Sequence, residues 1–253
     1  MSFELWPAID IRGGKCVRLL RGRFSDETVY GDPLEQAEAF VAAGAKRLHV
    51  VDLDAARDGG SPNRELVCAI ASGTAVPVQS GGGVRDEAAA EALFEGGVAR
   101  VVVGTLAVEQ PELVASMARA WPGRVAVGLD HRLGKGPDGT ARREVAVRGW
   151  VAGSGLALAE ALGRLEGLEL AGVVVTDIER DGTGDGPDLD GLARTLKATE
   201  LAVVASGGVA SVADLSALAR LSAGKRHLDG VIVGRALLSG AFSIAEAVAA
   251  CAP

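Results

Sequence analysis

The chain has 253 residues, of which 48% are hydrophobic, 23% charged and only 4% aromatic, and its formal net charge is −7 at pH 7. This composition excludes a disordered or fibrous protein, and the acidic balance argues against broad binding to nucleic acid or to an anionic membrane. The length and the 35 glycines favour an α/β fold in which residues 1–253 form one barrel domain.

Eight short runs rich in Val, Ile and Leu alternate with Ala-rich stretches. Each run has the length of a buried strand, and several are continuously apolar, as in parallel strands covered on both faces. An open doubly wound sheet is the alternative, but eight evenly spaced units without a glycine fingerprint after the first strand favour a closed (β/α)₈ TIM barrel. The predicted strands are 5–10, 47–54, 76–82, 99–105, 125–130, 172–177, 202–208 and 229–235, and the predicted helices include 33–43, 86–95, 111–120 and 155–166.

The two halves of the chain resemble each other. SGGGVRDEAAAEAL at 80–93 is similar to SGGVASVADLSAL at 206–218, and each is followed by an apolar run that ends in Val-Gly. The separation between matching positions is nearly constant, 120 residues from Asp10 to Asp130 and 130 residues from Gly104 to Gly234. Such a separation is too long for a solenoid repeat and predicts a half-barrel duplication with pseudo-twofold symmetry.

Four aspartates close predicted strands: Asp10, Asp52, Asp130 and Asp177. One such carboxylate can simply cap the next helix. In a barrel, however, the carboxyl ends of the strands form the active face, and the first and fifth strands lie opposite each other. Asp10 and Asp130 are therefore the predicted catalytic pair, one acting as a base and the other as an acid.

Glycine clusters end the third, fourth, seventh and eighth strands. Glycine lets backbone N–H groups approach an anion, and a following helix N-terminus adds partial positive charge. The clusters predict two phosphate cradles on opposite sides of the barrel, and thus an elongated substrate with a phosphate at each end. The predicted cradle residues are Gly81, Gly82, Gly83, Gly104, Thr105, Gly207, Gly208, Gly234 and Arg235, with Arg18, Arg85 and Arg148 as further countercharge.

Other polar and aromatic residues receive more limited predictions. His49 lies inside the second predicted strand, where a structural role and a substrate contact both remain open. Trp150 is expected to stack on an aromatic part of the substrate, and residues 131–155 are expected to form a mobile lid. Strand alternation turns His131 away from Asp130, which predicts a position on the loop surface. His227 is expected to be solvated.

The spacing of the cysteines and histidines indicates which metal sites and disulfides the chain can form. Cys16, Cys68 and Cys251 are far apart without a CxxC pair, which predicts neither disulfides nor a zinc site and favours a reducing, cytoplasmic location. Three scattered histidines lack ligand spacing, so we expect no metal, and no cofactor is expected. No apolar stretch approaches the roughly 20 residues that cross a bilayer, and the N-terminus lacks the pattern of a secretory leader.

Several motifs together resemble the histidine-biosynthesis isomerase family, and the resemblance spans nearly the whole chain. They are AIDIRGGKCVRL at 8–19, HVVDLDAA at 49–56, QSGGGVRD at 79–86, TDIERDGTGDGPD at 176–188 and VGRAL at 233–237. Members act on a bisphosphorylated phosphoribosylformimino derivative of aminoimidazole carboxamide ribotide. The resemblance implies an Amadori-type aldose-to-ketose isomerisation that needs no redox cofactor.

The resemblance also implies roles for individual residues. Asp10 matches the family's base and Asp130 its acid, while Thr176 and Asp181 match positions that contact substrate. An acid must keep its proton near neutral pH, so burial or a neighbouring carboxylate is expected to raise the pKa of Asp130.

Three alternatives remain. The related imidazole-forming cyclase is disfavoured by the run after Asp10, which resembles the isomerase. A dual-substrate isomerase that also converts phosphoribosylanthranilate stays open, because Arg148-Gly149-Trp150 resembles it whereas Gly81 stands where it typically has serine. A catalytically silent barrel that binds a phosphorylated metabolite is the alternative from a different class. We expect the isomerase to be a monomer whose partner is a small-molecule bisphosphorylated ribotide, whereas the cyclase would need a glutaminase partner.

Overall fold

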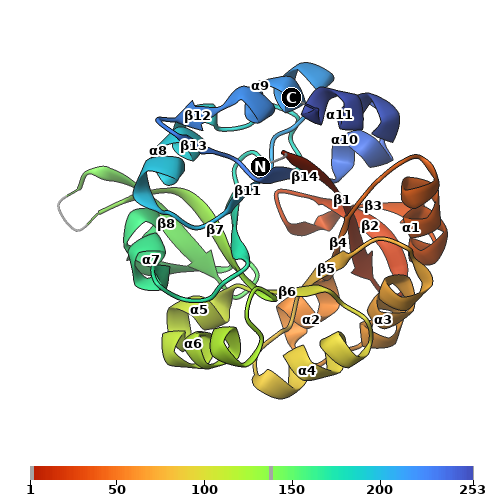
Figure 1. Ribbon diagram of the computed structural model, residues 1–253, viewed down its shortest axis with the longest axis horizontal. Coiled ribbons are helices and arrows are strands. Elements are labelled where there is room, and N and C mark those ends of the chain that lie inside the picture. The colour runs from red at the N-terminus through yellow and green to blue at the C-terminus, as the bar shows by residue number, and fades with distance from the viewer. Residues whose placement is uncertain (1–2, 137–138, 253) are drawn as a thin grey trace.

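A closed barrel of eight parallel strands forms the centre of the computed structural model, which describes residues 3–136 and 139–252 (Figure 1). Neighbouring strands pair in parallel around the ring, and the ring closes because β10 pairs with β7 and β1 pairs with β14. All eight predicted strands are confirmed. In ring order they are β1 (Glu4–Arg12), β4 (Leu48–Asp52), β5 (Val78–Gly81), β6 (Arg100–Val103), β7 (Val125–Lys135), β10 (Gly172–Asp177), β11 (Val203–Ser206) and β14 (Gly230–Val233).

Helices surround the barrel and cover the outer faces of the strands (Figure 1). The first helix begins where Asp32 accepts hydrogen bonds from the backbone N–H groups of Leu34 and Glu35 and Pro33 supplies the first helical turn. The longer helices are α1 (Pro33–Ala42), α3 (Arg64–Gly73), α4 (Glu87–Glu95), α6 (Pro111–Ala120), α7 (Leu158–Leu165), α8 (Leu189–Ala198), α9 (Val212–Arg220) and α11 (Ile244–Cys251). Three short helices follow strand ends: α2 (Leu53–Asp58), α5 (Thr105–Glu109) and α10 (Arg235–Leu238). None of the described helices is long and apolar enough to cross a membrane.

Two hydrophobic layers hold the barrel. The larger lies between strands and helices, where residues such as Ile9 and Leu48 are fully buried. The smaller lies inside the barrel, where Trp6 packs with Val174, Ile232 and their neighbours. Burying side chains on both faces of each strand explains the continuously apolar runs.

Two antiparallel extensions were not predicted. β2 (Lys15–Leu20) and β3 (Arg23–Gly31) fold back on β1, and β8 (Ala141–Val147) and β9 (Ala152–Ala157) fold back on β7. Part of the predicted lid over 131–155 thus belongs to the sheet, because β7 continues to Lys135 and pairs with β8. The helix predicted at 155–166 begins later than expected, because the residues up to Ala157 belong to β9. A two-stranded ribbon, β12 (Ser222–Ala223) and β13 (Arg226–His227), leaves His227 exposed, as predicted.

The backbone repeats between the halves. Gly104, after β6, has φ −105° and ψ −91°, and Gly234, after β14, has φ −109° and ψ −84°. Gly82 and Gly207 have φ of 92° and 93°, a left-handed conformation that favours glycine. Equivalent turns thus follow equivalent strands, which is the geometry that the sequence repeat predicts.

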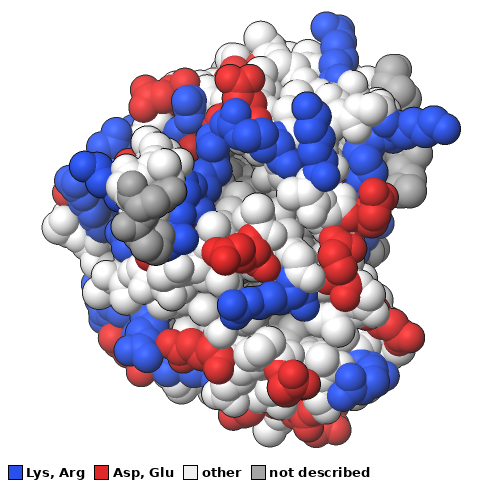
Figure 2. Space-filling model, turned by 90° about the vertical axis from the view of Figure 1, so that its left-hand side faces the viewer, with Lys and Arg blue, Asp and Glu red and all other residues white. Residues whose placement is uncertain are grey.

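Charge is unevenly spread over the surface. On the side that carries β8 and α8, a band of Lys and Arg side chains crosses the upper part of the view (Figure 2). An acidic chain can therefore still attract an anionic ligand locally.

Candidate active site

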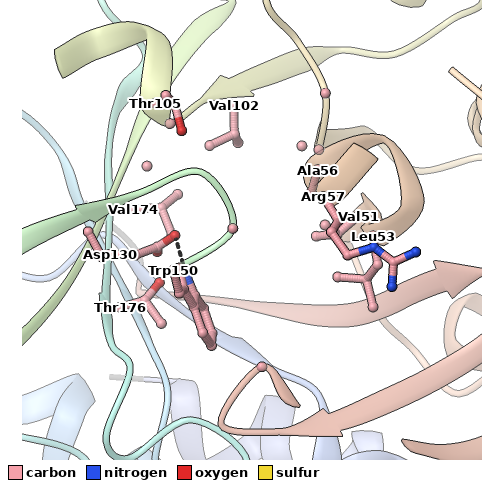
Figure 3. Close-up of a pocket in the computed structure, with 18 of the residues that line it drawn as sticks. Val51, Leu53, Ala56, Arg57, Val102, Thr105, Asp130, Trp150, Val174 and Thr176 are labelled. Carbon is pink, nitrogen blue, oxygen red and sulfur yellow. Dashed lines mark hydrogen bonds between the residues drawn. The ribbon is translucent and has the colours of Figure 1, made fainter. Parts of the chain in front are cut away.

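Both predicted catalytic aspartates line one cavity at the carboxyl ends of the strands. The cavity has a volume of about 540 Å³, and a second, smaller cavity of about 180 Å³ lies beside it. Arg18 and Asp181 line both cavities. Figure 3 shows Asp130, Trp150 and Thr176 on one side of the larger cavity, with Arg57 and Leu53 on the other. The cavities together form an elongated space with the two aspartates along it.

Asp10 forms an ion pair. It lies near the end of β1 and is 7% exposed, and Arg18 from β2 donates to its Oδ2 at 2.5 Å. The other amino group of Arg18 donates to Asp181 at 2.7 Å. One guanidinium thus bridges two carboxylates that are far apart in the chain. Burial raises the pKa of Asp10, the charge and hydrogen bond of Arg18 oppose that rise, the Asp181 carboxylate adds to it, and the net direction is upward.

Asp130 has neutral partners. The indole N–H of Trp150 donates to its Oδ2 at 2.7 Å, and the hydroxyl of Thr176 is a further hydrogen-bond donor (Figure 3). Among the ion pairs of the described residues, none includes Asp130. Burial raises its pKa, the two donors lower it, and the net direction is upward. The predicted direction of this shift is confirmed, with burial as its main cause.

The predicted glycine cradles lie at the two ends of this space. Gly81, Gly82, Gly83, Gly104 and Thr105 line the larger cavity. Gly207, Gly208, Gly234 and Arg235 line the smaller one. Loop residues that the sequence did not single out, Thr183 and Gly184, complete the second cradle. The two glycine clusters therefore line different cavities, and the aspartate pair lines the larger one together with the first cluster.

The predicted arginines differ in their surroundings. Arg85 is exposed and lines the larger cavity. Arg235 is exposed and donates to the backbone oxygen of Gly182. Arg148 forms an ion pair with Glu109 at 2.9 Å, and its backbone N–H donates to Thr105 at 2.8 Å. Arg18, which was predicted as phosphate countercharge, lines the smaller cavity and also bridges the carboxylates of Asp10 and Asp181.

Two strained turns meet over the larger cavity. Arg21, Arg148 and Trp150 are the non-glycine residues of the described chain with positive φ, at 51°, 57° and 71°. Arg21 lies in the β2–β3 turn and the other two in the β8–β9 turn. Gly22 packs so closely against the Trp150 ring that a side chain at position 22 would overlap it. Strain of this kind persists where surrounding contacts hold it, and here it aims Trp150 at Asp130.

A matched pair of glycines tests the Arg18 bridge. A Cβ at Gly234 would lie 2.9 Å from the Arg18 guanidinium, whereas at Gly104, with nearly the same backbone, the nearest atom is 3.9 Å away. We expect Gly234→Ala to displace Arg18 and lower kcat at least about tenfold. Gly104→Ala is expected to change KM and leave kcat within about threefold. Steady-state kinetics check this, and equal kcat values for the two variants would contradict it.

The structure also shows the surroundings of Asp52 and His131. Asp52 is a helix cap, since it accepts from the backbone N–H groups of Ala55 and Asn63. The surface position predicted for His131 is wrong. Its side chain does point away from Asp130, but that outer face is covered and His131 is only 4% exposed. Burial and the charge of Arg143 lower its pKa to about 4.

His49 and Phe24 also line the larger cavity. His49 was singled out from the sequence. Phe24 was missed because it lies in the unpredicted hairpin, where no periodic pattern marked it.

Residues 137–138 of the predicted lid lie outside the described residues, and lid motion stays a prediction. Among the described residues, no three His, Cys, Asp or Glu side chains cluster as metal ligands.

Comparison with known proteins gives consistent matches. Residues 4–243 match the family described as histidine biosynthesis protein. A protein from Synechococcus sp. (strain JA-2-3B'a(2-13)) is 45% identical over 99% of this chain and 91% of its own length. One from Dinoroseobacter shibae is 45% identical over 98% of this chain and 99% of its own, and one from Prochlorococcus marinus is 41% identical over 97% and 92%. All three are named 1-(5-phosphoribosyl)-5-((5-phosphoribosylamino)methylideneamino)imidazole-4-carboxamide isomerase.

Proposed function

Because the chain belongs to the histidine biosynthesis protein family and is an isomerase, we propose that it acts on the ribotide for which its relatives are named, with Asp10 and Asp130 as the catalytic pair. The reaction converts the aldose form of the phosphoribosylamino group to the ketose form. The space between the two glycine cradles suits a substrate with a phosphate at each end.

The proposed steps balance without an external oxidant. Asp130 protonates the ring oxygen of the aminated ribose, and the ring opens to an iminium. Asp10 removes the proton from C2, the electron pair moves toward nitrogen, and an enol-amine forms. The enol-amine then tautomerises to the ketose. Because both phosphates are held at a distance from the reacting carbons, binding energy orients C1 and C2 between the carboxyl groups.

The difference between the two carboxyl groups carries this assignment of roles. Asp10 pairs with the guanidinium of Arg18, which stabilises the ionised form that a base requires. Among the described residues, the hydrogen-bond donors to Asp130 are the neutral side chains of Trp150 and Thr176, and burial favours its protonated form. Burial raises the pKa of both carboxyl groups, and the guanidinium that opposes the rise lies beside Asp10, so ionisation is favoured at Asp10 relative to Asp130.

A pH profile tests the assignment. We expect a bell-shaped kcat/KM, which falls at low pH as Asp10 gains its proton and at high pH as Asp130 loses its own. Trp150→Phe removes a donor that stabilises ionised Asp130, so the pKa of Asp130 rises further and the high-pH limb moves to higher pH. Trp121→Phe, which alters a ring packed on Phe94 in the helical layer, is the control. An unmoved limb in Trp150→Phe would contradict the assignment.

The direct test is a steady-state assay with purified protein. Turnover of the imidazole carboxamide ribotide supports the proposal, and parallel incubation with phosphoribosylanthranilate decides whether the enzyme is dual-substrate. Binding of the ribotide without turnover would instead favour the silent barrel.

We propose further that the enzyme is a cytoplasmic monomer of one domain that needs no cofactor. Its three cysteines are free, which suits a reducing compartment. Sedimentation of a species twice the chain mass would refute the monomer.

A further inference from the structure

One wall of the barrel interior is polar. His49 on β4, Gln79 on β5 and Arg100 on β6 are adjacent in the register of the sheet, His49 beside Gln79 and Gln79 beside Arg100. The opposite wall is apolar and includes Val174 and Val204. Gln79 is 0% exposed, so its amide has only protein partners. The proposed mechanism does not use this wall.

The hydrogen bonds along this wall have a fixed direction. Arg100 Nη1 donates to Gln79 Oε1 at 3.5 Å, and arginine has no acceptor, so the amide oxygen must face Arg100. The amide nitrogen Nε2 therefore faces Nδ1 of His49, at 2.9 Å. An amide nitrogen only donates, so Nδ1 of His49 must accept. A neutral imidazole with a bare Nδ1 carries its proton on Nε2.

The His49 ring is neutral at ordinary pH. Burial, reinforced by the positive charge of Arg18, lowers its pKa to about 4. The charged groups around it are Asp10 on β1, Arg18 on β2 and, through Gln79, Arg100 on β6. His49 lines the larger cavity together with Asp10, and Nε2 is on the edge of the ring opposite Gln79.

We propose that Gln79 is a positioning residue that holds His49 as the Nε2–H tautomer, so that His49 donates a hydrogen bond to a sugar oxygen of the substrate next to Asp10. The hydrogen bond from His49 to the substrate rests on the proposed function, whereas the assignment of the tautomer does not. A tautomer fixed in advance spares the enzyme from selecting one during binding, which is a form of preorganisation.

Nitrogen NMR of the histidine rings reads the tautomer directly. The chain has 3 histidines, so full-length protein labelled with ¹⁵N-histidine gives few ring signals, which His131→Asn and His227→Gln assign. We expect Nδ1 of His49 to be bare and Nε2 to carry the proton between about pH 6 and pH 8. A protonated Nδ1 in the unmodified protein would overturn the proposal, and this readout requires no turnover.

Gln79→Glu reverses the direction of the hydrogen bond. A carboxylate beside Arg100 only accepts, so it draws a proton onto Nδ1 of His49 and leaves Nε2 bare whenever the ring is neutral. We expect kcat/KM to fall about tenfold near pH 8. The deficit should shrink at lower pH, because the introduced carboxylate stabilises the protonated ring and protonated His49 regains its Nε2–H. Gln36→Glu, on α1, is the matched control, and Gln79→Met reports the loss of the amide alone.

The possible results distinguish a failure of the Gln79–His49 proposal from a failure of the proposed isomerase function. A Gln79→Glu deficit that is the same at every pH indicates a merely structural role and overturns the proposal. If the unmodified protein does not turn over the ribotide, the proposed function fails, and with it the substrate contact, while the NMR spectra still decide the tautomer.

Discussion

Asp10→Asn is expected to lower kcat by about 100- to 10 000-fold, the range that a positioned general base contributes. The amide cannot remove the C2 proton, but its oxygen can still accept from Arg18, which also keeps its bond to Asp181. Substrate binding should therefore remain within about tenfold of the parent. The measurements are single-turnover kinetics for the chemical step and calorimetric titration for binding.

Asp58→Asn provides the control for that variant, because it makes the same substitution at an exposed position on α2. It should leave kcat unchanged. Parental turnover by Asp10→Asn would remove Asp10 from the mechanism, whereas a loss of binding as large as the loss of kcat would point to substrate recognition instead.

Asp130→Asn is the second large effect, with an expected loss of about 100- to 10 000-fold in kcat. The asparagine oxygen can still accept from the indole N–H of Trp150, so the strained β8–β9 turn keeps its anchor, yet no proton is available for ring opening. The residual activity should lose the high-pH limb of the profile and keep the low-pH limb. Asp10→Asn should show the reverse.

The two substitutions together give a further check. Because Asp130 acts in ring opening and Asp10 in removal of the C2 proton, each substitution slows its own step, and Asp10→Asn/Asp130→Asn should be little slower than the slower single variant. Multiplying losses would mean that both carboxyl groups act in one transition state, and parental turnover by Asp130→Asn would end its role as the acid.

The barrel could be predicted because its strands are covered on both faces and therefore consist of apolar runs. The two hairpins could not. β3 is mostly exposed and carries Arg, Ser, Asp, Glu and Thr, and β8 begins Ala-Arg-Arg-Glu, so neither shows the alternation or the apolar run that marks a strand. Their pairing with β1 and β7 comes from tertiary contact.

The site likewise divides into residues that the sequence predicts and contacts that form only in the folded barrel. Asp10, Asp130 and the glycine clusters are recognisable because each follows an apolar run and recurs in both halves. The Arg18–Asp181 bond joins residues 163 positions apart and exists only because the barrel closes. His131 was misplaced because alternation gives the direction of a side chain but not what covers it.

The hairpins that follow β1 and β7 differ in one respect: the first brings a guanidinium to its aspartate, and the second brings an indole. A symmetric barrel built from two copies of the segment from β1 through α6 would carry an arginine beside each carboxyl group. Both carboxyl groups would then have the same surroundings. Under the proposed mechanism, divergence of the two halves at these contacts is what distinguishes the base from the acid.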